Sequence, residues 1–196
     1  MVDWFAVATD RGGLEHVAKP LTLAVLIGAV ASLDTGNRPA WGAVMGALIF
    51  SLAGDVWLML PGEGWFVAGL GSFLVAHVAY VVAFWRTGVS WPALAVGLVV
   101  AVGAMVSLGR RIVSAVANSD RPDLKVPVAG YVGVISLMVA SAVGTRAALV
   151  IIGAGLFYCS DALIAWTRFI RDFRHGRLAV MVTYHLAQIL LVLSLY

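Results

Sequence analysis

Two carboxylates lie inside long apolar stretches of this chain. Asp55 is the one charged residue in "LIFSLAGDVWLMLP", residues 48–61. Asp161 stands in the same way in "GAGLFYCSDALIAW", residues 153–166. An aspartate at the centre of a membrane helix costs about 2.5–3.5 kcal/mol on insertion scales. Acids kept at that cost normally face the bundle interior and mark a working site, although a polar clamp between two helices is the simplest alternative.

The chemistry that such a pair of acids could do is proton transfer. Two acids that share one dry site divide naturally into a neutral group and an ionised group. Together they supply a proton donor and a negative charge, the combination that glycoside hydrolases use. The residues leave open which of Asp55 and Asp161 would be the acid. His77, or the second aspartate, could orient a water molecule, or His77 could be a core histidine with satisfied hydrogen bonds.

The elements that must position these residues are apolar runs of about twenty residues, the length that matches a hydrocarbon core of roughly 30 Å. The chain has 196 residues, of which 62% are hydrophobic and 12% are charged. A soluble domain is about half apolar and about a quarter charged. We therefore expect an all-α protein, a polytopic transmembrane helix bundle that forms a single domain over residues 1–196.

Seven membrane spans are predicted from the positions of these runs. They are 17–34, 40–60, 65–86, 92–109, 126–143, 147–168 and 178–196. Ser90 and Pro92 suit the N-cap and first turn of the fourth span. The segment "RRIVSAVANSDRPDLKVP", residues 110–127, is expected to be the longest polar connection, because Pro122 and Pro127 stop a continuing helix.

The cations of the loops predict how the bundle is oriented. Of the 13 lysines and arginines, ten fall on the side of the N-terminus, and the other side holds Arg38, Arg86 and Arg146. The positive-inside bias then places the N-terminus in the cytoplasm and the C-terminus outside. Topology also accounts for the net charge of +3, so no nucleic-acid partner is expected. We expect an integral protein of a bacterial cytoplasmic membrane.

Polar residues of separate spans converge on one depth. At about 1.5 Å per residue, they fall in a layer roughly 8–15 Å below the cytoplasmic face. The members of this layer are Asp55, Tyr131, Asp161, Tyr184, His185 and Gln188. His77 lies about 18 Å deep, and Lys19 lies at the mouth of the layer. The pattern predicts a cavity that opens to the inner leaflet.

Five short elements stand out along the chain. They are "AKPLT" (18–22), "GDVWLMLPGEGWFVAGLGSFLVAHVAY" (54–80), "YVGVISLM" (131–138), "GAGLFYCSDALIAWTRF" (153–169) and "YHLAQ" (184–188). In this order they resemble signatures of the YhhN-like family of transmembrane lysoplasmalogenases. The family usually has a further helix before the lysine–proline element, eight in all. Either the start lies upstream of this numbering or this member has seven spans. His185 falls outside the family pattern, whereas Tyr184 and Gln188 fall inside it.

The resemblance implies an activity and a set of site residues. The best-known members of the family hydrolyse the vinyl-ether bond of lysoplasmalogens to a fatty aldehyde and a glycerophospho-head-group. A lysolipid substrate in a lipid bilayer is therefore expected, with no cofactor and no metal. Acid–base catalysis would fall to Asp55, Asp161 and His77, with the site facing the cytoplasmic leaflet. Lys19 could pair with the lipid phosphate, or could be a snorkelling anchor.

The remaining candidate residues would bind the substrate. Tyr131, Tyr184 and Gln188 could hold the glycerol. Ser160 is also a candidate, although it suggests no catalytic triad with Asp161 because adjacent residues of a helix point in different directions. Packing is the simpler explanation of Ser160.

Two other functions remain open at this point. In a proton-coupled transporter, chains of acids and histidines relay protons across the membrane. Asp55 with His77 and Asp161 with His185 form a faint parallel of that kind. In a metal-dependent membrane hydrolase the same four residues would be ligands, although they show no ligand spacing. The sequence identifies neither the lipid that is processed nor the oligomeric state.

Overall fold

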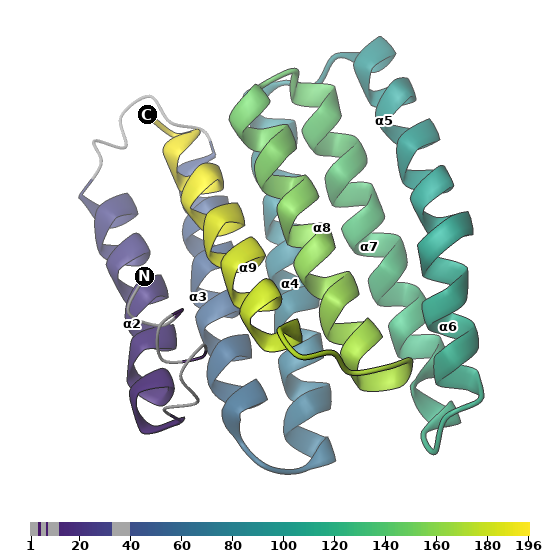
Figure 1. Ribbon diagram of the computed structural model, residues 1–196. Coiled ribbons are helices and arrows are strands. Elements are labelled where there is room, and N and C mark those ends of the chain that lie inside the picture. The colour runs from purple at the N-terminus through teal and green to yellow at the C-terminus, as the bar shows by residue number, and fades with distance from the viewer. Residues whose placement is uncertain (1–3, 5–6, 8–11, 33–39) are drawn as a thin grey trace.

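Long apolar helices lie side by side throughout the protein (Figure 1). The computed structural model describes residues 4, 7, 12–32 and 40–196, with the backbone alone for 12–16. The α-helices of this part are α2 (Gly12–Ala31), α3 (Trp41–Met59), α4 (Glu63–Thr87), α5 (Trp91–Ala104), α6 (Arg110–Ala117), α7 (Lys125–Thr145), α8 (Ala148–Phe169) and α9 (Gly176–Leu193). A π-helical turn, Met105–Gly109, joins α5 to α6, and a 3-10 turn, Pro122–Leu124, precedes α7.

Six helical segments of the described residues are long and apolar enough to cross a membrane. They are Trp41–Met59, Glu63–Thr87, Trp91–Ala117, Pro122–Thr145, Ala148–Phe169 and Gly176–Leu193. A shorter apolar helix, Val17–Ala31, precedes them. These segments correspond to the seven predicted spans, and they confirm the expected all-α bundle of membrane helices. Part of the first predicted connection, residues 33–39, and the cations Arg11 and Arg38 lie outside the described residues.

The fourth span is longer than predicted. The expected polar connection begins at residue 110, but the helix continues through α6 to Ala117. Ile112 and Val116, four residues apart, are both buried, whereas Arg110 and Arg111 are exposed. Residues four apart share one face of a helix, so α6 keeps an apolar face toward the bundle and directs its arginines outward. The predicted start of the connection was wrong because it was based on the two adjacent arginines and not on the helical spacing of the apolar residues.

The helices are arranged so that their connections gather at two ends. In Figure 1, α2 lies at one edge of the bundle, and α5 with α6 lies at the other. Between these edges α3 packs against α4, α8 against α9, α4 against α7, and α7 against both α5 and α8. The α3–α4, α6–α7 and α8–α9 connections share the lower end of the picture, and the α4–α5 and α7–α8 connections share the upper end.

A cluster of aromatic rings forms the centre of the core. The Phe157 ring of α8 is fully buried. It meets the rings of Phe73, His77, Tyr80 and Tyr184 in edge-to-face contacts, with centroids 6.3, 4.7, 6.2 and 5.4 Å away. Such contacts add to the free energy of burial, and they fix the mutual position of α4, α8 and α9.

A close approach of the α5 and α7 backbones requires a glycine. A Cβ added at Gly97 of α5 would lie 2.5 Å from the carbonyl oxygen and 2.9 Å from the Cα of Ala140 in α7. We expect Gly97→Ala to destabilise the protein by about 1–3 kcal/mol, because the two backbones would have to separate. The midpoint of thermal unfolding in detergent measures this loss.

A matched control is available in the same helix. A Cβ at Gly103 would have no atom within 4 Å. Gly103→Ala should therefore leave the midpoint unchanged or raise it slightly, because alanine favours helix more than glycine does. Equal midpoints for the two variants would contradict the close packing of α5 on α7.

Candidate active site

The first polar centre of the bundle surrounds Asp55 of α3. This side chain is 1% exposed. The ammonium of Lys19, from α2, lies 3.1 Å from Oδ1 of Asp55. The hydroxyl of Tyr184, from α9, donates a hydrogen bond of 2.8 Å to Oδ2. Both oxygens of the carboxylate thus have a partner, and the helices α2, α3 and α9 meet at one buried ion pair.

The position of Lys19 differs from the one expected from the sequence. The predicted span began at residue 17, which placed Lys19 at the mouth of the polar layer, but α2 begins at Gly12. Lys19 is therefore in the second turn of the helix, and its side chain is 8% exposed. A buried ammonium needs a counter-charge, and Asp55 supplies it. In this state Lys19 contacts a carboxylate of the protein, a different partner from the lipid phosphate considered above.

The second polar centre surrounds Asp161 of α8. The hydroxyl of Tyr131, from α7, donates a hydrogen bond to Oδ2 of Asp161. The Nε2 atom of His77, from α4, lies 3.4 Å from the same oxygen. The His77 ring is fully buried and lies edge-on against Tyr131, with ring centroids 5.3 Å apart. Among the described side chains, no lysine or arginine forms an ion pair with Asp161, in contrast to Asp55.

A small apolar cavity opens beside Asp161. Its volume is about 60 Å³, and its walls come from α3, α4, α6, α7 and α8. Three residues with polar groups, Tyr131, Tyr158 and Asp161, stand in a wall that is otherwise apolar. The wall of this cavity is thus mostly apolar, and one carboxyl group stands in it.

The two acids belong to neighbouring centres rather than to one wall. Among the described residues, Asp161 lines the cavity and Asp55 does not. The Phe157 ring contacts His77 on the Asp161 side and Tyr184 on the Asp55 side. Phe73, a wall residue of the cavity, also contacts Tyr184, with ring centroids 5.8 Å apart. The structure describes two neighbouring polar centres that both contact the Phe157 ring, and the meeting of both carboxyls across one hollow stays a prediction.

The other candidate residues make contacts within the bundle. Gln188 is fully buried, and its Oε1 accepts a hydrogen bond from the hydroxyl of Tyr80. The hydroxyl of Ser160 donates a hydrogen bond of 3.1 Å to the carbonyl oxygen of Val180. Ser160 thus ties α8 to α9, in agreement with the packing explanation. The Nδ1 atom of His185 accepts a hydrogen bond of 3.1 Å from the indole of Trp4.

Two features of the site are missing from the sequence interpretation. Tyr80 is not among the predicted site residues, although it follows His77 by three residues and therefore shares its helix face. The second feature is a set of charged residues, Glu63, Arg121 and Arg168, close to the end of the cavity. These residues lie in connections or at helix ends, where charge is expected in any membrane protein. No signal in the sequence therefore distinguishes them from the other charged residues of the connections.

Metal ligands do not gather at either centre. Across the described side chains, no group of three or more histidine, cysteine, aspartate or glutamate residues is close enough to hold a metal ion. His77 and Asp161 form a pair, whereas Asp55 pairs with Lys19.

Curated proteins that resemble this chain carry one common name. The human protein named lysoplasmalogenase TMEM86B is 35% identical over 153 residues, which cover 77% of this chain and 62% of the relative. The pig protein of the same name is 32% identical and covers 93% of this chain and 74% of the relative. The lysoplasmalogenase of Mycobacterium tuberculosis is 31% identical over 192 residues, 96% of this chain and 72% of the relative.

The match to the family extends over almost the whole chain. The match spans 62% of the length of the human relative. No solved structure matches the chain. The sequence profile of the YhhN family matches residues 14–195, a range that contains both polar centres and the cavity, and the chain therefore belongs to the YhhN family.

Proposed function

We propose that this protein is a membrane hydrolase that cleaves the vinyl-ether bond of lysoplasmalogens and releases a fatty aldehyde and a glycerophospho-head-group. The relatives named lysoplasmalogenase support the reaction class. The observation that carries the proposal is the carboxyl of Asp161 in the wall of an apolar cavity. Tyr131 and His77 support this carboxyl.

The proposed reaction begins with a proton transfer to carbon. Asp161, in its neutral form, protonates the alkene carbon that is not bonded to oxygen, and the other alkene carbon becomes part of an oxocarbenium ion. Water adds to that carbon and returns one proton to the Asp161 carboxylate. The resulting hemiacetal collapses, its hydroxyl proton passes to the glycerol oxygen, and the carbon–oxygen bond breaks. One water molecule is consumed, and the acid is regenerated.

The geometry of Asp161 assigns roles to its neighbours. Both contacts described for this side chain, from Tyr131 and His77, fall on Oδ2. The transferred proton is therefore assigned to Oδ1. Tyr131 and His77 fix the direction of the carboxyl, as the neighbours of a catalytic acid must do if it is to meet the reacting carbon.

Asp55 has a different role in this proposal. Its carboxylate already forms an ion pair with Lys19 and accepts a hydrogen bond from Tyr184. It therefore serves as a positioning residue, because it holds Tyr184 against Phe73 and Phe157 at the back of the cavity. In this proposal Asp161 is the acid and Asp55 is not.

The side of the membrane follows from the charges of the connections. One end of the bundle holds the α6–α7 and α8–α9 connections. Near this end lie Arg121, Lys125, Arg168, Arg171 and Arg174. The opposite end carries Arg86 and Arg146 among the described residues. By the positive-inside bias, the first end faces the cytoplasm. The cavity would then receive lysolipid from the cytoplasmic leaflet of a bacterial membrane.

The test is to incubate the purified protein with lysoplasmalogen in D₂O and trap the aldehyde at once as a hydrazone. We expect aldehyde with one deuterium on the carbon next to the carbonyl, because the acid delivers a solvent-derived proton to that carbon. Mass spectrometry of the hydrazone measures the label. Absence of aldehyde, or aldehyde without deuterium, would contradict the proposal.

Two further conditions separate the alternative functions. Loss of product in the presence of a chelator would favour the metal-dependent hydrolase. Lysolipid movement across sealed vesicles without aldehyde would favour the transporter.

A further inference from the structure

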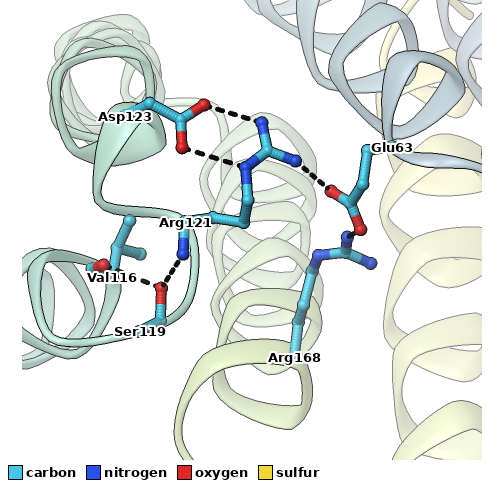
Figure 2. A network of polar contacts seen from close by, with 6 residues as sticks. All are labelled: Glu63, Val116, Ser119, Arg121, Asp123 and Arg168. Carbon is cyan, nitrogen blue, oxygen red and sulfur yellow. Dashed lines mark hydrogen bonds and ion pairs between the residues drawn. The ribbon is translucent and has the colours of Figure 1, made fainter.

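A network of four charged residues joins the start of α4 and the end of α8 to the α6–α7 connection (Figure 2). The guanidinium of Arg121 donates two hydrogen bonds, of 2.9 and 2.6 Å, to the two oxygens of Asp123. It donates a third, of 2.9 Å, to Oε2 of Glu63. The guanidinium of Arg168 donates a hydrogen bond of 2.6 Å to Oε1 of Glu63. Two arginines therefore converge on the two oxygens of one carboxylate.

The network lies at one end of the apolar cavity. Phe66, in the first turn of α4, and Phe169, the last residue of α8, both line the cavity. Their rings meet edge-to-face with centroids 6.3 Å apart. The guanidinium carbon of Arg168 lies 3.7 Å from the centre of the Phe66 ring. The charged network is thus adjacent to the cavity at the ends of α4 and α8, through the contact of Arg168 with the wall residue Phe66.

The two arginines are held in place more firmly than Glu63. Asp123 binds Arg121 through two parallel hydrogen bonds, the arrangement that fixes a guanidinium best. The Phe66 ring supports Arg168 through a cation–π contact. Glu63 has one hydrogen bond to each arginine, and its side chain is 52% exposed. Exposed ion pairs contribute only about 0–1 kcal/mol, so Glu63 can leave at little cost.

Another anion with several oxygens could occupy the same place. The side chains of Arg121 and Arg168 are 35% and 34% exposed, so solvent and ligands reach them. A guanidinium matches phosphate in geometry as well as in charge, and it binds phosphate through two hydrogen bonds. Arg168 follows Asp161 by seven residues of α8, a rise of about 10 Å. A lysophospholipid has its phosphate separated from the ether bond by a glycerol, which fits this order of groups.

We propose that Arg121 and Arg168 form the receptor for the phosphate of the lysolipid head-group, and that Glu63 occupies this receptor when no lipid is bound. This inference deepens the proposed function and rests on it. The phosphate replaces the Glu63 carboxylate between the two guanidinium groups, the glycerol passes Phe66, and the ether carbon reaches Asp161. Glu63 therefore competes with the substrate and closes the charged end of the empty cavity.

The test measures binding rather than hydrolysis. The probes are a 1-O-alkyl lysophospholipid and the 1-O-alkylglycerol with the same chain, which lacks the phosphate. Neither probe has a vinyl-ether bond, so the result is independent of aldehyde release. Failure of the D₂O experiment would count against the proposed reaction, whereas failure of the binding experiment with normal aldehyde release would count against the receptor alone. Equilibrium binding of each radiolabelled probe to the full-length protein in detergent gives the two dissociation constants.

We expect the affinity for the lysophospholipid to change in opposite directions when an arginine of the receptor and when Glu63 is replaced. Arg168→Gln should weaken binding of the lysophospholipid about tenfold to a hundredfold, because charge-assisted hydrogen bonds are lost, and should leave binding of the alkylglycerol unchanged. Glu63→Gln should tighten binding of the lysophospholipid severalfold, because the competing carboxylate is gone. An equal loss for both probes in Arg168→Gln, or weaker binding in Glu63→Gln, would overturn the receptor.

Two controls complete the experiment. Arg174 is an exposed arginine of the α8–α9 connection, and Arg174→Gln removes the same charge without touching the network. It should change neither dissociation constant, and an effect equal to that of Arg168→Gln would overturn the specific role of Arg168. Inorganic phosphate is the second control. Binding of inorganic phosphate as tight as that of the lysophospholipid would assign the receptor to free phosphate and overturn the lipid head-group.

Discussion

Replacement of Asp161 by asparagine is expected to lower the rate of aldehyde release at least a hundredfold. A positioned general acid contributes about 10²–10⁴-fold to a rate, and an amide cannot deliver the proton to carbon. The asparagine side chain has the same shape and keeps an oxygen that can accept the hydrogen bond from Tyr131. The bundle should therefore remain folded. Initial rates with lysoplasmalogen in detergent measure the effect.

A second measurement separates chemistry from structure in this variant. The thermal midpoint of Asp161→Asn and its affinity for the 1-O-alkyl lysophospholipid should both stay close to those of the unchanged protein. The matched control is Asp172→Asn, which makes the same change at an exposed residue just beyond α8. It should retain full activity. If Asp161→Asn hydrolysed the substrate at a normal rate, Asp161 would not be the acid.

Replacement of Lys19 by methionine is expected to cause the largest loss of stability. Removal of one partner from a buried ion pair leaves an uncompensated charge, which costs about 3–5 kcal/mol. In Lys19→Met the uncompensated group is the carboxylate of Asp55, which is 1% exposed. The midpoint of thermal unfolding in detergent should therefore fall sharply. Aldehyde release should fall with it, because Tyr184 loses the fixed carboxylate that it contacts.

A double variant tests whether the two residues act as a pair. With Asp55→Asn added to Lys19→Met, no buried charge remains at this centre, and much of the lost stability should return. The interaction free energy of the double-mutant cycle then differs clearly from zero. Strictly additive effects would show that Lys19 and Asp55 do not depend on each other. Recovery of activity in the double variant would further support Asp161 as the acid.

The sequence predicts the membrane spans well because hydrophobic length is a local property. Each apolar run contains enough information to place a helix, and the charges at its ends restrict where it stops. The helix α6 is the exception, since Arg110 and Arg111 interrupt a run whose buried face continues through Ile112 and Val116. The helix α6 can be predicted only from the helical spacing of its apolar residues, because the average hydropathy of the segment is lowered by the two arginines.

The candidate site was only partly accessible from the sequence. Asp55 and Asp161 stand out because a single charge in an apolar helix is rare. Their partners depend on which helices are neighbours, and no spacing along the chain indicates that Lys19 of α2 meets Asp55 whereas His77 of α4 meets Asp161. The contact of the Phe157 ring with both centres depends in turn on how that ring packs, which is a property of the assembled core.

The unequal ends of the cavity bear on where the two products of the proposed reaction would go. At one end the wall residue Phe66 contacts Arg168 of the charged network, and most other wall residues are apolar. A glycerophospho compound is soluble in water and would depart past the charged residues into the aqueous phase. A long-chain aldehyde is soluble in hydrocarbon and would pass into the bilayer. The different solubility of the two products would thus separate them after each turnover. Their separation would make re-formation of the ether bond negligible.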